Sequence, residues 1–468
     1  MSGNDIKKYK PSIYSHWIEH NGSVILYNSL YGVNGIKKYS GEHKNKVIAC
    51  IKKEEIVHET DPVIQSLIEN HYVVPADCDE SLLLNKLYLK CINGNILHLV
   101  ILPTEQCNFR CRYCYESFSR GRMSDETIRA IIKYVRINIS KYAGLKASWF
   151  GGEPSLEIDT ICEMSKEFIK ICKTAKRKYW ANITSNGYLI DLENFKKLYK
   201  ANVFNYQITI DGIESTHDQQ RVLGSGKGSF NKIIDNLLSI KENSECKHWQ
   251  ITIRTNFSKP IFDHIDEYIS FYHDHFGEDR RFVFLFRPAG DWGGDSVKSY
   301  SDNLLQTDGF AQVFESMLQH TKTLDISRHL SFLNPGGSIC LASGANTFLI
   351  DSSGTIRKCS CHLDDDRNTI GHVMPDGTFQ IDQYNYCKWI QDRWRKEKCK
   401  NCFFLPACMN ASCPANYVLS RSDPNQIRLN FRILIDCFRA VAGFVCIRIA
   451  IFIKRVFYHH SHECCIIY

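Results

Sequence analysis

Between residue 96 and about residue 290, short apolar runs alternate with longer segments in which apolar residues recur every three or four positions. The short runs have the length and composition of buried strands, and the longer segments have the period of amphipathic helices. The expected strands are Ile96–Leu102, Ala147–Phe150, Tyr179–Thr184, Asn205–Ile210, Trp249–Thr255 and Arg281–Phe286. Six strand–helix steps predict an α/β fold with parallel strands and outer helices, a partial (β/α)6 TIM-like barrel.

The segments between these strands carry helix signals. Ser124 can cap a helix, and the acidic residues Asp125 and Glu126 suit its positive end. The expected apolar stripes of three helices are Ile128, Ile131, Ile132 and Val135, then Ile161, Met164, Phe168 and Ile171, then Ile233, Ile234, Leu237 and Leu238. In a barrel of this kind, functional residues should lie at the carboxyl ends of the strands.

The first 95 residues precede the barrel pattern and predict a small α+β domain. Ser23–Asn28 is typical of a strand. Asp61–Asn70 predicts a helix with Asp61 as its cap, and His71–Val74 predicts a strand after it.

Composition narrows the function classes. A chain of 468 residues is too long for one core, so several domains are expected. The net charge of +7 without a long basic run argues against nucleic acid as the main partner. The 21 cysteines are unusual, and the polar start does not indicate a secretory leader. We therefore expect a cytoplasmic protein whose cysteines serve metal or redox chemistry rather than disulfides.

The most informative stretch follows the first barrel strand, where Cys107, Cys111 and Cys114 are spaced C-x3-C-x2-C. A short loop of this kind supplies three thiolate ligands to one metal centre, whereas an ordinary cubane iron–sulfur cluster takes four. One iron would then be open to a substrate or cofactor. The alternative is a zinc knuckle or a set of structural cysteines, although zinc usually recruits a fourth ligand, often a histidine.

With Tyr113 in the aromatic position, this loop resembles the C-x3-C-x-aromatic-C motif of the radical S-adenosylmethionine (radical SAM) family. The resemblance implies a [4Fe–4S] cluster on Cys107, Cys111 and Cys114 that binds S-adenosyl-L-methionine at its open iron. It further implies reductive cleavage of that cofactor to a 5′-deoxyadenosyl radical, which takes a hydrogen atom from a substrate.

Polar motifs follow the later strands, where the same family places its cofactor contacts. The Gly151-Gly152-Glu153-Pro154 turn can approach a ligand closely and offer carbonyls to an ammonium group. In the family this turn holds the methionine amino group. The resemblance also implies ribose, carboxylate or substrate contacts at the strand ends, and for each residue alone a turn or cap role is the alternative. The residues concerned are Ser185, Asn186, Asp211 and, as the partner of the cofactor carboxylate, Arg254.

A second group of cysteines resembles the SPASM domain, an extension of radical SAM peptide maturases that holds up to two auxiliary [4Fe–4S] clusters. The seven matching residues are Cys340, Cys359, Cys399, Cys402, Cys408, Cys413 and Cys437. The family spacing is broken once, because four residues rather than three separate Cys408 from Cys413. A pair of zinc ribbons is the alternative for this region.

The resemblance implies interleaved ligation of the two auxiliary clusters. Cys340, Cys359 and Cys413 would hold the first, with Cys361 or an open iron in fourth place. The second would be held by Cys399, Cys402, Cys408 and Cys437.

The expected domains are 1–95, 96–325, 326–437 and an apolar tail, 438–468. The first is either a winged-helix-like peptide-recognition domain or a packing extension of the barrel. Gly290–Gly294 and a helix around Leu304–Leu324 should link and cover the barrel. The tail segment Ala440–Ile453 has 14 residues, fewer than the roughly 20 that span a bilayer, so we expect it to pack rather than to cross a membrane.

The SPASM resemblance implies a ribosomally made peptide or protein substrate and a thioether or carbon–carbon crosslink as product. An electron donor such as ferredoxin or flavodoxin would be a partner. One alternative is a sulfatase-type maturase that makes formylglycine. The alternative from another class is a non-catalytic iron–sulfur or zinc scaffold that binds a peptide.

Overall fold

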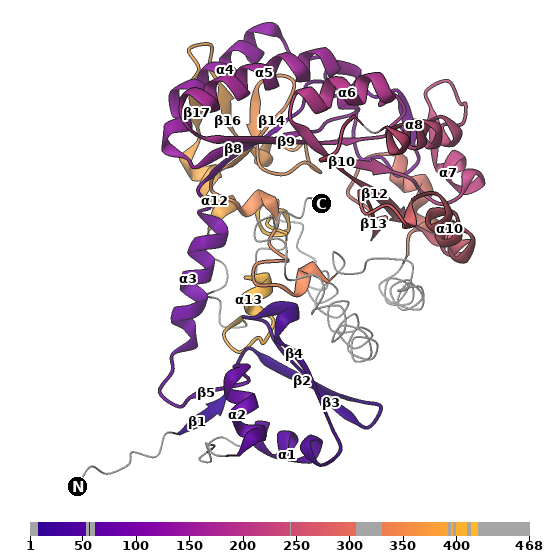
Figure 1. The fold of residues 1–468 in the computed structure, drawn as a ribbon. Helices are drawn as coiled ribbons and strands as arrows, with labels where there is room; N and C mark the ends of the chain where they lie inside the picture. Colours follow the sequence, from indigo (N-terminus) through magenta and orange to yellow (C-terminus); the bar gives the residue numbers. More distant parts are fainter. Residues whose placement is uncertain are drawn as a thin grey trace.

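The computed structural model describes residues 8–52, 56, 61–243, 245–305, 330–391, 395, 399–409 and 413–419. A ten-stranded sheet forms the centre of the described part, in the order β13-β12-β10-β9-β8-β6-β14-β15-β16-β17. The strands from β13 to β6 are all parallel, and helices cover their outer face (Figure 1). This arrangement confirms the prediction of a partial (β/α)6 barrel.

The barrel strands are β6 (Ile96–Ile101), β8 (Gly144–Trp149), β9 (Lys178–Ser185), β10 (Val203–Thr209), β12 (Gln250–Phe257) and β13 (Phe282–Pro288). Its helices are α4 (Asp125–Asn138), α5 (Ile158–Thr174), α6 (Leu192–Lys200), α7 (Glu214–Gln220), α8 (Phe230–Glu242), α9 (Lys259–Phe262) and α10 (Ile265–Tyr272). Shorter elements are β7 (Phe109–Cys111), β11 (Arg221–Leu223), η2 (Ile139–Lys141), η3 (Pro154–Glu157), the π-helical turn η4 (His273–Gly277) and η5 (Ser296–Asn303). Each predicted strand is present, with ends that differ by at most three residues.

Side chains of the barrel strands alternate between two environments. Leu97, Leu99 and Ile101 of β6 belong to the large core that the outer helices complete. The intervening His98 points to the other side of the sheet, where its Nε2 lies 2.8 Å from Ser148 Oγ. The barrel interior therefore contains buried polar groups, while the largest apolar core lies between sheet and helices.

The N-terminal region forms the predicted α+β domain, with a hydrophobic core separate from that of the barrel. Its strands β2–β3–β4 make a small antiparallel sheet, and α3 leads from this domain to the barrel (Figure 1). Asp61 caps α2 as expected, accepting hydrogen bonds from Val63 N and Ile64 N. The elements are β1 (Tyr9–Pro11), β2 (Ser15–His20), β3 (Ser23–Asn28), η1 (Gly32–Gly35), β4 (Ile36–Ser40), α1 (Glu42–Ile51), α2 (Pro62–Glu69), β5 (Val73–Pro75) and α3 (Glu80–Ile92).

The cysteine-rich region adds strands to the barrel sheet. Strand β14 (Thr347–Ile350) pairs in parallel with β6, and an antiparallel series continues from it. The remaining elements are η6 (Ser331–Leu333), η7 (Leu341–Ser343), β15 (Thr355–Arg357), η8 (Asp366–Asn368), β16 (Thr369–Val373), β17 (Phe379–Ile381), α12 (Gln383–Ile390), α13 (Leu405–Cys408) and α14 (Ala415–Val418). The predicted third domain thus shares one sheet with the barrel.

Some predicted features lie outside the described residues. These are most of the helix around Leu304–Leu324, the apolar tail with Ala440–Ile453, and Cys437. Within the described ranges, none of the helices combines the length and the apolar character that a membrane crossing needs.

Candidate active site

The loop with the three cysteines is held by a two-stranded sheet. Strand β7 pairs antiparallel with β11, and Cys111 lies opposite Arg221 in that pair. Cys107 Sγ accepts a hydrogen bond from Phe109 N at 3.3 Å, and Cys114 N donates to Cys111 O at 3.1 Å. The chain therefore turns back on itself within the loop and brings the three cysteines to one side of the barrel mouth.

The three thiols are electrostatic neighbours. Cys107 interacts with both other cysteines, and Cys114 interacts with Cys111. Burial raises the pKa of each thiol, that of Cys114 to about 12. Across the described ranges, no three or more Cys, His, Asp or Glu side chains are gathered tightly enough to hold one metal ion. The three thiols are thus close to one another, but they are not close enough to coordinate one metal ion together.

The glycine–glutamate turn packs directly on this loop. A Cβ on Gly152 would lie 2.5 Å from the carbonyl oxygens of both Glu105 and Gln106, and a Cβ on Gly151 would lie 2.3 Å from Thr104 O. Glu153 N donates to Gln106 O at 2.9 Å. Only glycine permits this approach, because any Cβ would push apart the two backbones that meet just before Cys107.

The Glu153 carboxylate is buried, with an exposed fraction of 1%, and its oxygens are engaged within the protein. They accept hydrogen bonds from Ser155 N (2.9 Å), Ser185 Oγ (2.7 Å) and Asn186 N (2.6 Å). Burial raises the pKa of this carboxyl group, and the three donors oppose that shift. Glu153 therefore joins the ends of β8 and β9 through its carboxylate.

A second cluster surrounds Asp211 at the end of β10. Its carboxylate accepts hydrogen bonds from Tyr113 Oη and, at 2.7 Å, from Asn256 N. The Tyr113 hydroxyl also lies in hydrogen-bond contact with Arg221 Nη1 and with Asn256 Nδ2. Tyr113 thus fixes the cysteine loop to the ends of two strands, which gives the aromatic position of the motif a physical role.

Two arginines have donor groups left over at this site. Arg254 Nε donates to Asn256 Oδ1 at 3.1 Å, and Arg254 forms no ion pair within the part of the chain that the structure describes. Arg221 is more deeply buried, and its Nε has no hydrogen-bond partner there. The sequence analysis assigned a role to Arg254 but none to Arg221, because only the pairing of β7 with β11 reveals the position of Arg221.

The glycine-rich stretch after β13 lies against the cysteine loop. A Cβ on Gly294 would meet Tyr115 Cα at 2.9 Å and Cys114 O at 3.2 Å, and Gly294 has φ +87°. The stretch that was predicted to link and cover the barrel therefore borders the same mouth as the three cysteines.

The cysteine loop also contacts the C-terminal region. Buried Glu105 accepts hydrogen bonds from Ser352 N (3.2 Å) and Ser352 Oγ (2.8 Å), and it forms a bidentate pair with Arg120. Arg120 in turn pairs with Asp364 at 3.0 Å. The loop that should bind the cofactor is therefore fastened to the cysteine-rich region by buried polar contacts.

The predicted ligands of the first auxiliary cluster are partly assembled. Cys359 interacts electrostatically with Cys340, and its sulfur accepts a hydrogen bond from Cys361 N at 3.4 Å. The Cys361 thiol also contacts the Tyr115 hydroxyl, next to the radical SAM cysteines. Asn368 orders this loop through both its amide atoms, donating to Cys359 O at 2.7 Å and accepting from Cys359 N at 2.9 Å.

Three of the four predicted ligands of the second auxiliary cluster are neighbours near α13. Cys402 interacts electrostatically with Cys399 and Cys408, and burial raises the pKa of Cys402 to about 11. Cys413, which was predicted for the first cluster, has its Sγ 3.6 Å from Asn416 Oδ1.

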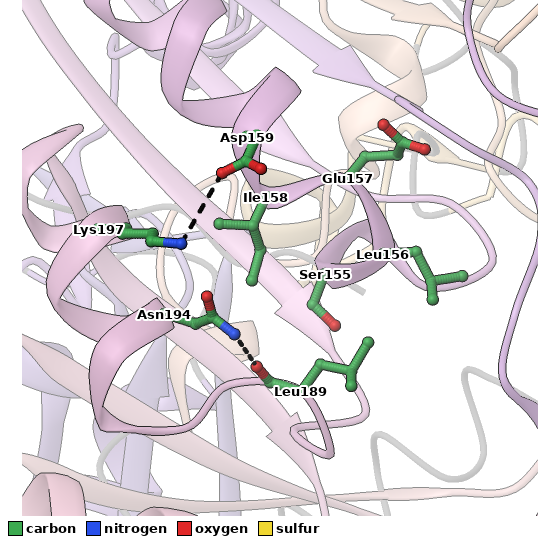
Figure 2. A pocket seen from close by; sticks show the side chains of 8 residues that line it. All are labelled: Ser155, Leu156, Glu157, Ile158, Asp159, Leu189, Asn194 and Lys197. Carbon is green, nitrogen blue, oxygen red and sulfur yellow. Dashed lines mark hydrogen bonds and ion pairs between the residues drawn. The ribbon is translucent and has the colours of Figure 1, made fainter.

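A surface pocket lies on the helix side of the glycine–glutamate turn (Figure 2). Ser155 lines it from η3 and Asp159 from the start of α5, and Lys197 of α6 lies 4.0 Å from Asp159. None of the predicted cofactor-binding residues lines this pocket, so it is separate from the site described above.

Comparison with known proteins accounts for this combination of fold and site. The profile of the Radical SAM superfamily matches residues 101–253. This match indicates an enzyme that uses S-adenosylmethionine and, as that superfamily implies, a [4Fe–4S] cluster. The prediction of a radical SAM domain is confirmed for this segment, and the SPASM-type C-terminal domain stays a prediction.

Among its relatives is the cysteine-type anaerobic sulfatase-maturating enzyme of Clostridium novyi, 27% identical over 68% of this chain and 88% of the relative. The solved structure of native anSMEcpe with bound AdoMet and the Cp18Cys peptide is 17% identical, with a TM-score of 0.57, over 76% of this chain and 99% of that one. Streptococcus suis SuiB bound to its precursor peptide SuiA is 16% identical, with a TM-score of 0.50, over 89% of this chain and 97% of that one.

Proposed function

We propose that this enzyme abstracts a hydrogen atom from a ribosomally made peptide and leaves a thioether or carbon–carbon crosslink in it. The observation that carries this proposal is the N-terminal α+β domain, which has its own hydrophobic core. SuiB, solved with a precursor peptide, aligns with 89% of this chain, against 76% for anSMEcpe. The larger share supports an N-terminal peptide-recognition domain in addition to the barrel.

The N-terminal domain would deliver the peptide toward the cysteine-rich region, which it contacts. His16 stacks on Phe403, with ring centroids 4.2 Å apart, and Tyr27 Oη donates to Leu333 O at 2.6 Å. The outer strands of its three-stranded sheet are β2 and β4. An extended peptide can pair with the edge of such a sheet as an additional strand. We place its boundary near residue 95, that of the barrel near 325 and that of the cysteine-rich domain near 437.

The residues of the barrel mouth fit the cofactors that the family implies. Cys107, Cys111 and Cys114 would hold the cluster, since their thiols are neighbours and the glycine–glutamate turn touches their loop. When bound, the reduced cluster supplies the electron that cleaves S-adenosylmethionine and so produces the 5′-deoxyadenosyl radical. The protein's share of this chemistry is to bind, orient and shield the reactants.

Each predicted cofactor contact has a specific task in this proposal. The carbonyls of the Gly151–Pro154 turn would accept from the methionine ammonium group, because the Glu153 carboxylate is already engaged. Arg254 has donors free for the carboxylate, and Arg221 is a second candidate for that role. Ser185, Asn186 and Asp211 would border the ribose, positioned by the hydrogen bonds they make with Glu153 and Asn256.

The auxiliary clusters complete the proposal. Cys340, Cys359 and Cys413 would hold the first, and Cys399, Cys402, Cys408 and Cys437 the second. A ferredoxin or flavodoxin would supply electrons to the enzyme. Because exposed thiolates and iron–sulfur clusters need reducing conditions, we place the enzyme in the cytoplasm.

The proposal is tested in two stages after anaerobic reconstitution with iron and sulfide. In the first, dithionite should drive 5′-deoxyadenosine formation by the wild type and none by the Cys107→Ala, Cys111→Ala, Cys114→Ala triple variant. In the second, a short peptide encoded beside this protein should lose two hydrogen atoms by mass spectrometry. The same peptide without its N-terminal half should remain unmodified. Modification of both peptides would contradict recognition by the N-terminal domain.

Formylglycine formation is the second candidate, since the Clostridium novyi relative matures sulfatases. A peptide with a sulfatase-type cysteine site, offered in parallel, distinguishes the two. Conversion of that cysteine to an aldehyde, with no change in the neighbouring peptide, would replace the crosslinking proposal by this one.

A further inference from the structure

Arg221 is placed beside a predicted cluster ligand by the backbone itself. It is the register partner of Cys111 in the antiparallel pair β7·β11. Side chains directly opposite in such a pair lie on one face, with Cβ atoms about 4.5–5.5 Å apart. Cys111 and Cys114 both interact electrostatically with the Arg221 guanidinium. A positive charge is therefore fixed at one side of the cysteine loop.

The surroundings of this guanidinium leave part of it unused. The Arg221 side chain is 8% exposed and its face lies over the Phe109 ring, 5.7 Å from the centroid. Nη1 contacts the Tyr113 hydroxyl and lies 3.6 Å from the Asp211 carboxylate. The Nε–H group is buried without a partner in the described part of the chain. Leaving such a donor unpaired is unfavourable, and Arg221 is the register partner of Cys111, so a cluster bound at the cysteine loop would supply an acceptor close to this arginine.

We propose that Arg221 raises the reduction potential of the cluster on Cys107, Cys111 and Cys114, by setting a buried positive charge and an N–H donor beside the Cys111 sulfur. Reduction adds one electron, and so one negative charge, to the cluster. A fixed cation a few ångströms away stabilises that charge strongly in a site shielded from water. Net charge and hydrogen bonds to sulfur are among the factors that set iron–sulfur potentials.

The Asp211 carboxylate should oppose the effect of Arg221 on the reduction potential. This buried carboxylate offsets part of the Arg221 charge, so the two side chains should act on the potential in opposite directions. Loss of Arg221 leaves a carboxylate near the cluster, which disfavours the reduced form. Loss of the Asp211 charge leaves the guanidinium uncompensated, which favours it.

The test is a dithionite titration of the reconstituted enzyme, followed by electron paramagnetic resonance and carried out without S-adenosylmethionine. The signal of this cluster is the one that the triple cysteine variant lacks. Arg221→Gln should lower the midpoint potential of this cluster by at least about 59 mV, which corresponds to a tenfold change in the one-electron equilibrium constant. Arg221→Lys should retain most of the wild-type value, and Asp211→Asn should shift it upward.

The control is Arg136→Gln, because Arg136 is a 60% exposed surface residue on α4 that pairs only with Glu167 among the described residues. It should leave the potential unchanged. The proposal is overturned if Arg221→Gln titrates like the control, or if Arg221→Gln and Asp211→Asn shift the potential in the same direction. Should Arg221→Gln not load iron, Asp211→Asn decides the matter: an upward shift of the potential supports the proposal, and an unchanged or lowered potential overturns it.

Discussion

Replacing Gly152 by alanine should disable the enzyme through geometry alone. Gly152 lacks the positive φ that marks other glycines of this chain, so alanine meets no backbone strain there. The added Cβ would instead lie 2.5 Å from two carbonyl oxygens, whereas contacts under 3.0 Å are essentially never seen. The turn and the backbone at Glu105–Gln106 must separate by at least about half an ångström, and by about 1 Å for a relaxed contact.

That displacement occurs one residue before Cys107, so it moves the cysteine loop relative to the cofactor contacts. A misplacement of about 1 Å in a reacting site can lower the rate roughly 10²-fold, and an overpacked contact costs about 1–3 kcal/mol of stability. We therefore expect Gly152→Ala to form 5′-deoxyadenosine about 10²-fold more slowly and to bind S-adenosylmethionine more weakly. Both quantities are measured on enzyme with a determined iron content.

The matched control is Gly121→Ala. Gly121 lies in the same loop region and accepts a hydrogen bond from Glu105 N, but nothing lies within 4 Å of its added Cβ. It should behave as the wild type. Equal rates for the two alanine variants, at equal iron content, would refute the claim that close contact between the turn and the loop positions the reaction.

Glu153→Gln replaces a carboxylate that accepts three hydrogen bonds by an amide that cannot accept all three, so thermal unfolding should show a loss of about 2–4 kcal/mol that Glu163→Gln, at an exposed position of α5, does not show. Burial lowers the pKa of His217 well below its usual value, so below about pH 6.5 only the unfolded chain takes up a proton and stability falls as the pH falls. His217→Gln should reduce the loss of stability between about pH 7.5 and about pH 5.5 by roughly 1 kcal/mol, and an unchanged pH dependence would exclude His217 as its source. Asn368→Ala should increase amide hydrogen exchange in residues 358–362, because the buried amide that holds Cys359 is removed, and protection equal to the wild type would contradict that role.

The periodic pattern predicted the barrel well, because its strands are buried on both faces and its helices on one. The prediction was least accurate at β8, which begins three residues earlier than expected. Gly144 and Lys146 interrupt the apolar run there, yet both are buried. Gly144 is needed because Lys178 O would lie 2.8 Å from any Cβ, and Lys146 belongs to the polar barrel interior. Neither reason can be read from local sequence.

The motifs predicted which residues gather at the site, but not how they are connected. Glu153 was predicted as part of a cofactor-binding turn, but the motif did not reveal that its carboxylate joins two strand ends. The position of Arg221 depends on a pair of three-residue strands more than a hundred residues apart. Such short strands carry no periodicity, so only the folded chain shows that Arg221 lies opposite Cys111.

The parallel pairing of β14 with β6 has a consequence for synthesis of the protein. β6 is apolar except at His98, and until β14 leaves the ribosome one of its edges has no hydrogen-bonding partner. Some 250 residues are made in that interval, since β6 begins at Ile96 and β14 at Thr347. An unpaired strand edge of this kind can pair with another nascent chain and so promote aggregation. Chaperone demand during translation should therefore be highest before the cysteine-rich region emerges.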